Sequence, residues 1–287
     1  MIVKKCFLNV IKYLVVFITL GSFVCVLSGC MWLFDEKPRD INGMIKSQGK
    51  KYEDIYELTC DPGDDASISS KHFELLGKLV NLEKIKFVGI ASDDDAQRFF
   101  SKLSELKKLH TVEIVDSSHV EKIDKLGDIE NLKNLSIIGR RYGGTKSYVI
   151  KDLDLLYKDS RFRKIESLTL KHVKTDRLPN LTRLTGLKKL SISGDKIKEL
   201  DEDAVNWEQL ETLELYDSDI SSIDKSIVSR LTNLQTMDIS YSKITDVSFV
   251  LDLPKLKNFK CLRHNKRGID VTCLRKHPNY NKNWDAE

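Results

Sequence analysis

Apolar residues recur along most of the chain in one short frame, in which the first, fourth and sixth places are apolar and most residues between them are polar. Nine such frames begin at Ile55, Leu82, Leu109, Leu132, Ile165, Leu187, Leu210, Leu234 and Leu256. A further apolar residue stands three places before each frame, so four places recur in all nine. Hydrophobic residues make up only 41% of the chain, so chance does not account for this regularity.

The fourth and sixth places alternate as the residues of a strand do, so each frame predicts one short strand with both of these side chains pointing inward. The frames are 22 to 33 residues apart, which leaves the rest of each repeat to return the chain to the next strand. A single repeat cannot bury its own apolar side. Stacking nine repeats produces one continuous core and a parallel sheet.

This pattern resembles the leucine-rich repeat family, whose motif is L-x-x-L-x-L with a polar residue three places on. The resemblance covers roughly residues 52–264, and the short spacings of the later frames are similar to the internalin-like bacterial class. It implies an α/β solenoid of about nine repeats, with a parallel sheet on the concave face and mixed helical and irregular returns on the convex face. The family usually has Asn at the ninth place, where it bonds the turning backbone. Here the candidates to replace it are Ser117, Asp195, Ser218 and Ser242.

The return after the second frame is predicted to be helical. Ser92 is placed to cap such a helix, and Asp93–Asp95 suit its positive N-terminal end. Phe99, Leu103 and Leu106 would form its apolar stripe. The acidic triplet is read as capping rather than as a metal site, because no loop of spaced oxygen ligands follows it.

The first 30 residues have the layout of an exported leader. Lys4, Lys5 and Lys12 precede or begin a long apolar run. Leu27-Ser28-Gly29-Cys30 then resembles a bacterial lipobox, which implies cleavage before Cys30 and lipidation of its thiol. The predicted organisation is a signal peptide at 1–29, a lipidated N-terminus and short linker at 30–51, the repeat domain at 52–264 and a C-terminal cap and tail at 265–287.

An uncleaved signal anchor is the alternative, because the apolar stretch of residues 13–34 is about as long as the roughly 20 residues that a membrane span needs. Both interpretations place the rest of the chain outside the cytoplasm, with the lysines inside. The predicted location is therefore the bacterial cell envelope, with a lipid anchor in the membrane, and the outer membrane if the cell has two.

Charge and motifs exclude several classes of function. The formal net charge of +4 includes three leader lysines, so the processed chain is nearly neutral and nothing favours nucleic acid as a partner. The six histidines show no paired metal spacing, and no G-x-S-x-G, H-E-x-x-H or P-loop motif is present. We therefore predict neither an enzyme nor a bound cofactor or metal.

The cysteines outside the leader divide by position. Cys60 and Cys261 occupy the same inward place in the first and last frames, too far apart to form a disulfide. Cys261 and Cys273 are twelve residues apart in the segment that closes the stack. Disulfides persist outside the cytoplasm, so these two residues either form a bond in the cap or remain buried thiols.

Two features are candidates for binding a partner. The outward place after the sixth is aliphatic on three neighbouring strands, at Val88, Val115 and Ile138, and carries Tyr216 further on. An exposed apolar strip of this kind marks a partner site. The alternatives are that β-branched residues simply favour strands or that a loop covers them.

The second feature is an insertion of about ten residues in the 33-residue repeat. It contains Arg140, Arg141, Tyr142 and Tyr148, and Arg and Tyr are common at binding hot spots. A tolerated insertion without function is the alternative. Together these features predict a lipid-anchored protein that binds a protein or a cell-surface polymer through its concave face and this loop. A structural envelope lipoprotein that scaffolds its neighbours is the competing class, and an envelope-polymer enzyme is a weaker one.

Overall fold

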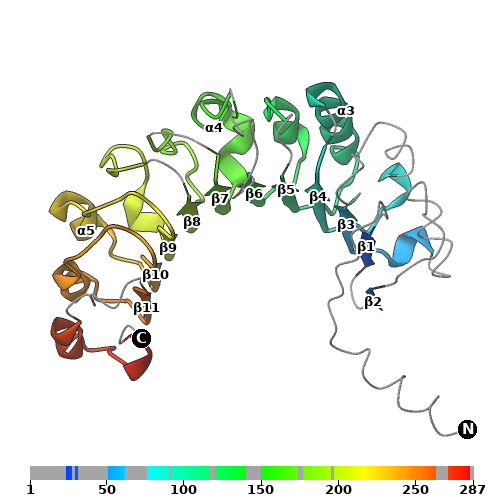
Figure 1. The fold of residues 1–287 in the computed structure, drawn as a ribbon. Helices are drawn as coiled ribbons and strands as arrows, with labels where there is room; N and C mark the ends of the chain where they lie inside the picture. The colour runs from blue at the N-terminus through cyan, green and yellow to red at the C-terminus, as the bar shows by residue number, and fades with distance from the viewer. Residues whose placement is uncertain are drawn as a thin grey trace, which may run out of the picture.

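The chain winds into an arch of stacked rungs, with strands on the inner side and helices on the outer side (Figure 1). The structure is a computed structural model and describes residues 24–27, 30–31, 51–61, 76–90, 92–116, 120–139, 150, 152–173, 177–194, 197–262 and 271–284. The arch confirms the predicted α/β solenoid with a parallel sheet on its concave face.

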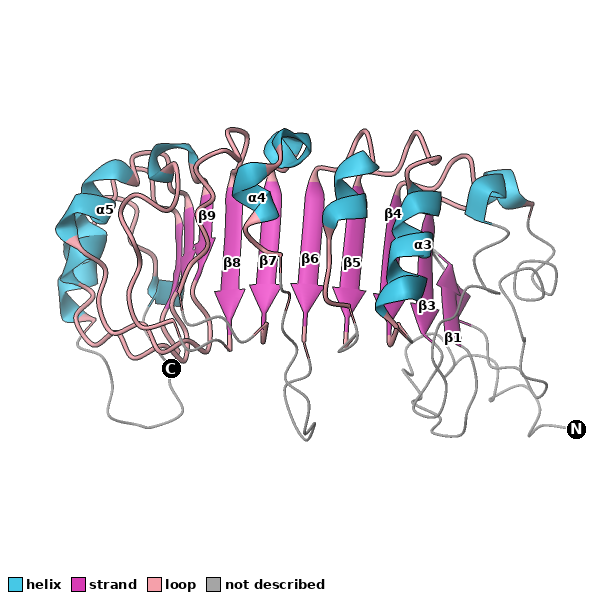
Figure 2. Cartoon of the chain, turned by 90° about the horizontal axis from the view of Figure 1, so that it is seen from above, coloured by secondary structure: helices cyan, strands magenta, loops and turns pink. Residues whose placement is uncertain are grey.

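Each predicted frame forms one strand. The strands are β3 (Glu57–Asp61), β4 (Lys84–Val88), β5 (Thr111–Val115), β6 (Asn134–Ile138), β7 (Ser167–Lys171), β8 (Lys189–Ser193), β9 (Thr212–Glu214), β10 (Thr236–Asp238) and β11 (Asn258–Lys260). They pair in parallel and in chain order, and Figure 2 shows their arrowheads at one edge of the sheet. The register places the fourth-place residue of every strand opposite that of the next, as with Leu168, Leu190 and Leu213.

The inward places form one core. Every residue at the first, fourth and sixth places of the nine frames is at most 2% exposed. The residue three places before the frame is also buried in eight repeats, the exception being Tyr52. Burying each Leu or Ile contributes about 1.5 to 3 kcal/mol, so this core supplies the main stabilisation of the stack.

The returns on the outer side are short and mostly of the tight 3-10 type. Within the described residues, the α-helices are α3 (Asp93–Leu103), α4 (Leu155–Lys158) and α5 (Lys225–Arg230). The 3-10 helices are η1 (Tyr52–Asp54), η3 (Leu76–Lys78), η4 (Asp124–Asp128), η5 (Ser160–Lys164), η6 (Trp207–Gln209), η7 (Ser248–Asp252), η8 (Thr272–Lys276) and η9 (Lys282–Trp284). This mixture matches the predicted convex face.

Helix α3 follows the prediction closely. Its N-cap Ser92 accepts a hydrogen bond from the backbone N–H of Asp95 at 3.1 Å. The ring of Phe99 packs edge-on against Phe87 of β4, with centroids 3.9 Å apart. Asp93 Oδ1 accepts from the backbone N–H groups of residues 121 and 122 in the next return, at 2.9 and 3.1 Å. This carboxylate therefore joins two repeats, and no metal-binding group of His, Cys, Asp or Glu occurs within the described ranges.

A row of asparagines joins neighbouring rungs at a place that the sequence analysis did not single out. Asn81, Asn131 and Asn233 each stand directly before the first-place Leu of a frame. Each side-chain amide donates to a backbone carbonyl of the preceding repeat at 2.7 Å. These hydrogen bonds join each of these rungs to the preceding one at the start of the strand, the opposite end from the ninth place.

At the ninth place itself, the serines behave as expected where the structure describes them. Ser218 Oγ donates to the carbonyl of Leu215 at 3.0 Å, and Ser242 Oγ accepts from the N–H of Ile244 at 3.3 Å. Ile90 and Val173 are buried there instead and add apolar contact. Ser117 and Asp195 lie outside the described residues.

The N-terminal edge of the sheet carries two antiparallel strands. β1 (Val24–Leu27) pairs with β3, and β2 (Cys30–Met31) pairs with β1. β1 falls inside the predicted leader, so removal of residues 1–29 would uncover the edge of β3. Within the described part of the chain, no helix is long and apolar enough to cross a membrane.

The C-terminal end is closed by an aromatic cap. Trp284 is buried, its ring centroid lies 6.0 Å from that of Phe259, and its Nε1 donates to the carbonyl of Lys257 at 3.1 Å. Cys261 is buried in the last rung and Cys273 is partly exposed in η8. No disulfide joins Cys261 to Cys273 in the structure. Both are thiols, which is one of the two alternatives that the sequence allows. An oxidised pair stays a prediction.

The core predicts the effect of truncating a central rung. Leu190→Ala should lower the free energy of unfolding by about 2 to 5 kcal/mol, because a fully buried side chain leaves a cavity that the neighbouring rungs cannot fill. Urea denaturation followed by circular dichroism measures the change. Leu251→Ala is the matched control, since Leu251 is 36% exposed on the outer side and should lose less than about 1 kcal/mol. Equal losses in the two variants would contradict the assigned rung.

Candidate binding surface on the concave face

The predicted aliphatic strip lies on three neighbouring strands of the inner face. Val88, Val115 and Ile138 end β4, β5 and β6, and the register pairs each with the next. All three are half-buried, so the strip is less exposed than a bare apolar patch. Further along the same column, Leu262 is 39% exposed. Residues 140–149, which contain Arg140, Arg141, Tyr142 and Tyr148, lie outside the described residues.

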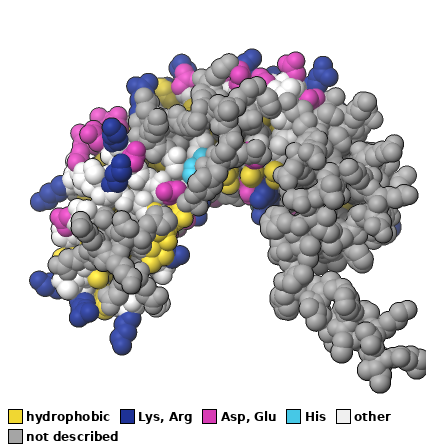
Figure 3. All heavy atoms as spheres, viewed as in Figure 1, with side chains coloured by type: hydrophobic (Ala, Val, Ile, Leu, Met, Phe, Trp, Pro, Cys, Tyr) yellow, Lys and Arg dark blue, Asp and Glu magenta, His cyan; other side chains and the backbone are white. Residues whose placement is uncertain are grey.

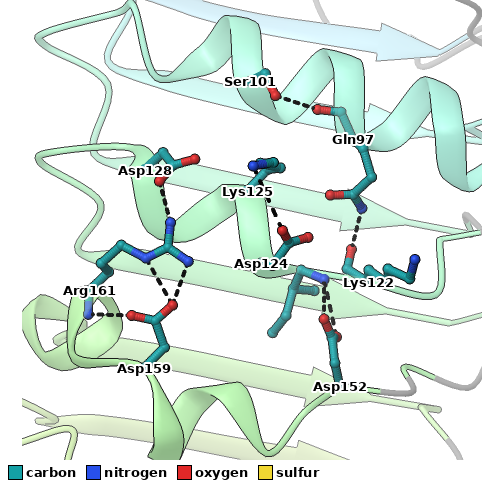
Figure 4. A network of polar contacts seen from close by, with 10 residues as sticks. Gln97, Ser101, Lys122, Asp124, Lys125, Asp128, Asp152, Asp159 and Arg161 are labelled. Atoms are coloured by element: carbon teal, nitrogen blue, oxygen red, sulfur yellow. Dashed lines mark hydrogen bonds and ion pairs between the residues drawn. The ribbon is translucent and has the colours of Figure 1, made fainter.

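The base of this insertion is held firmly. Gly139 and Ile150, which flank it, are buried, and Gly139 N–H donates to the carbonyl of Lys171 at 2.7 Å. After the insertion, Asp152 accepts the backbone N–H of Ile123 through both carboxylate oxygens, at 3.1 and 3.2 Å (Figure 4). Burial raises the pKa of Asp152 against the lowering effect of this bond. The loop therefore starts and ends at fixed points beside β6 and β7.

A second polar group on the outer side ties the same repeats together. The Arg161 guanidinium contacts both Asp159 and Asp128, which stand in successive returns (Figure 4). The side-chain hydrogen bond from Arg161 is the main cause that lowers the pKa of Asp159. Because these groups are largely exposed, the pairs contribute only modestly to stability. The contacts of Arg161 with Asp128 and Asp159 join successive returns on the convex side.

Ion pairs neutralise much of the charge in the middle of the concave face. Lys86 Nζ lies 3.1 Å from Glu113 Oε1 on the next strand, and Lys189 Nζ lies 2.5 Å from Glu214 Oε1. Burial alone would raise the pKa of Glu214, but the bond from Lys189 and the charge of Lys171 outweigh it and lower that pKa. Glu214 is therefore ionised at neutral pH and keeps Lys189 in place.

The strand at the centre of the arch carries two small outward side chains after Lys189. Ser191 and Ser193 of β8 are each 1% exposed. The hydroxyl of Ser191 helps to lower the pKa of Glu214 on the next strand. This strand is the floor of the concave face, with larger side chains rising on both sides.

A left-handed turn follows the strands at the eighth place of the frame, and the sequence analysis did not identify it. The backbone φ there is positive at Gly89, Asp116, His172, Gly194, Asp217 and Tyr241, between 50° and 68°. The glycines at this place were the available signal, since Gly adopts this conformation without strain. The other four residues, Asp116, His172, Asp217 and Tyr241, give no such signal, because their types alone do not predict a left-handed turn.

Two ring contacts occur at or beside this turn, one with a glycine and one between two tyrosines. The ring of His172 occupies the space beside Gly194, where an added Cβ would fall on its Nδ1 and Cε1 atoms. Tyr216, a predicted partner-binding residue, meets the ring of Tyr241 edge to face, with centroids 5.3 Å apart. Tyr216 is thus part of a cluster with a residue that the sequence analysis did not select.

Several charged groups on the described inner face have protein partners. Two lysine–glutamate pairs join neighbouring strands, and Asp238 Oδ1 accepts a hydrogen bond from the N–H of Ser240 at 2.9 Å. What the face offers is a broad curved array of hydroxyl, amide, aromatic and aliphatic groups.

Comparison of the whole fold with solved structures gives matches to curved repeat proteins. TLR13, solved in complex with a single-stranded RNA, matches with 19% identity and a TM-score of 0.55, over 73% of this chain and 29% of that chain. A leucine-rich repeat protein of Leptospira interrogans matches with 19% identity and a TM-score of 0.48, over 78% of this chain and 54% of that one. Internalin C2 of Listeria monocytogenes matches with 16% identity and a TM-score of 0.41, over 86% and 90%.

The fold is a leucine-rich repeat solenoid. The inward frame, the parallel register and the TLR13 match agree on this. The solenoid spans about half the length of the Leptospira protein and less than a third of TLR13. No protein-family model matches the sequence, and no curated protein matches it either. These likenesses establish the fold alone.

The contact between His172 and Gly194 predicts a specific coupling. Gly194→Ala should destabilise the solenoid by about 2 to 4 kcal/mol, because the new methyl group meets the His172 ring and the positive φ disfavours Ala. Removing the ring with His172→Ala in the same chain should restore the part due to the clash. Thermal unfolding of the single and double variants measures the coupling.

Gly186→Ala is the matched control for that measurement. The nearest heavy atom to an added Cβ at Gly186 is the carbonyl oxygen of Ile165 at 3.7 Å, an ordinary contact distance. This variant should change stability little. If the changes in melting temperature caused by His172→Ala and Gly194→Ala simply add in the double variant, the His172 ring does not occupy the space beside Gly194.

Proposed function

We propose that this protein is an extracytoplasmic binding module, held at a membrane by lipid on Cys30, whose concave face docks a protein or a surface polymer. The observation that carries the proposal is the inner face itself. Nine strands present their outward residues in aligned columns, and part of that surface is apolar or aromatic. Curved repeat surfaces of this kind suit extended partners.

The aliphatic strip and the insertion support a docking position in the first half of the arch. Val88, Val115 and Ile138 lie in register, and the insertion leaves the sheet directly after Ile138. Half-buried β-branched side chains beside a loop containing Arg and Tyr form a surface on which a partner excludes water. Arg140, Arg141, Tyr142 and Tyr148 are proposed contacts on the basis of the sequence.

The membrane anchor is supported by the leader pattern. The first rung, β3, begins at Glu57, about 27 residues after Cys30. A lipid on Cys30 would hold this end of the solenoid near the membrane. Two or more acyl chains bind a bilayer firmly, whereas one binds marginally.

Substituting the aliphatic strip tests the docking surface. In the full chain, replacing Val88, Val115 and Ile138 together with Ser should reduce capture of a crosslinked partner from envelope or host-surface extracts at least tenfold, because the apolar contact is lost. Deleting residues 140–148 should also reduce capture if the loop takes part. Quantitative mass spectrometry of the captured species measures both.

Val80→Ser is the matched control for the strip. Val80 is 57% exposed in a turn before β4, outside the concave columns, so its loss should leave capture unchanged. Undiminished capture by the triple variant would instead favour a scaffold that acts through another face.

The anchor predicts a defined mature terminus. Mass spectrometry of the protein from bacterial membranes should find Cys30 as the first residue, carrying acyl chains. Cys30→Ser should abolish processing, since the thiol is the group that takes the lipid. Finding Met1 intact with an unmodified Cys30 thiol in the wild-type protein would refute lipidation and favour the signal anchor.

A further inference from the structure

A row of rings follows the carboxyl edge of the sheet in the second half of the arch. We define the aromatic row as His172, Tyr216 and Tyr241. His172 lies against Gly194 of the next rung, Tyr216 follows on β9, and Tyr241 follows β10. Figure 3 shows hydrophobic side chains gathered on the inner wall beside β9 and β10. Leu262, 39% exposed, extends the row by one rung.

The backbone is strained at one member of the aromatic row, Tyr241. Its φ is 59°, where Gly89 and Gly194 serve the same turn at 68° and 67°. For a bulky residue such as Tyr, positive φ is a genuine outlier, whereas His172 at 54° belongs to a type that adopts it more readily. Strain of this kind concentrates at functional sites. A glycine at position 241 would relieve the strain but remove the ring, so the ring itself is the feature to explain.

The surface around the aromatic row is rich in small hydroxyl and amide groups. The accessible hydroxyl and amide side chains at the outward places of β7 to β11 are Ser167, Thr169, Thr212, Thr236 and Asn258. Ser191, Ser193 and Ser240 are buried on the same face. The carboxylate of Asp238 adds an acceptor beside them. A ligand with many hydroxyl groups would match such a surface.

The charge of the described inner face does not favour a polyanion. At the third, fifth, seventh and eighth places of the frames from β4 to β11, the described basic residues are Lys84, Lys86, Lys171, Lys189 and Lys260, and the acids are Glu113, Asp116, Glu214, Asp217 and Asp238. Arg263 is the remaining basic residue at these places and lies outside the described residues, so the two signs nearly balance, and two of the pairs are in contact. Single-stranded nucleic acid also stacks on aromatic rows, but it requires a positively charged groove.

We propose that the aromatic row binds an uncharged glycan chain running across the rungs. The inference rests on the proposed concave-face function and names the ligand class for its second half. The ring faces carry partial negative charge, so the polarised C–H faces of sugars pack against them. The sugar hydroxyls exchange hydrogen bonds with the Ser, Thr and Asn side chains and with Asp238. Ligand sites of this type combine apolar contact area with a few placed polar groups.

The test uses the full chain in mild detergent and two uncharged probes, maltohexaose and hexa-N-acetylchitohexaose. Calorimetric titration should show binding of at least one, with little change between low and high salt. Tyr216→Ala and Tyr241→Ala should each weaken that binding at least tenfold. Tyr241→Gly should also lose binding while its melting temperature stays equal or rises, because glycine relieves the backbone strain. This last variant separates loss of the ring from loss of the fold.

Tyr157→Ala is the matched control, since Tyr157 is 36% exposed in α4 on the outer side and should leave binding unchanged. Failure of both probes to bind overturns the proposal, as does binding that the Tyr variants do not weaken. Tighter binding of heparin or polyuridylate with steep salt dependence would show a polyanion site instead.

The outcomes also separate this inference from the proposed function. If a protein partner is captured and the Tyr variants abolish that capture while neither sugar binds, the row is a protein contact and the glycan assignment fails. If the strip variant at Val88, Val115 and Ile138 loses capture and the Tyr variants do not, the docking function stands without the glycan.

Discussion

The whole structure depends on the fact that one rung cannot bury its own apolar edge. The strand at Leu190 hides its side chain only because Leu168 and Leu213 lie on either side of it. Each rung is therefore stabilised by its neighbours, and the outward residues are free to vary because they take no part in this packing. That separation explains how a uniform core supports a concave face that changes from aliphatic at Val88 to aromatic at Tyr241.

Side chains at several different places bond one rung to the next. Asn81, Asn131 and Asn233, directly before the frame, each donate to a carbonyl of the preceding repeat. Asp93, in the return, accepts from two backbone N–H groups of the next return. The contacts between rungs are therefore not confined to one residue type at one place.

The sequence was sufficient to predict the core and insufficient for most of the surface. Positions such as Leu168 and Ile192 were predictable because burial imposes one chemical class at a fixed period. The contact of His172 with Gly194 was not, because it depends on a left-handed turn and on the direction of one ring. Tyr216 was selected from its column, but its contact with Tyr241 joins the seventh place of one frame to the eighth of the next. Outward residues obey no period, so their partners emerge only when the rungs are stacked.

The two ends of the arch are built differently, and this limits how such a protein can change in length. Trp284 seals the last rung by packing on Phe259 and bonding the chain at Lys257. A duplicated repeat appended after that cap would find no open strand to join. New rungs can be gained only before this cap, where a strand edge or a neighbouring rung with the same inward pattern can receive them. Over evolutionary time the arch would lengthen on the N-terminal side of its sealed end.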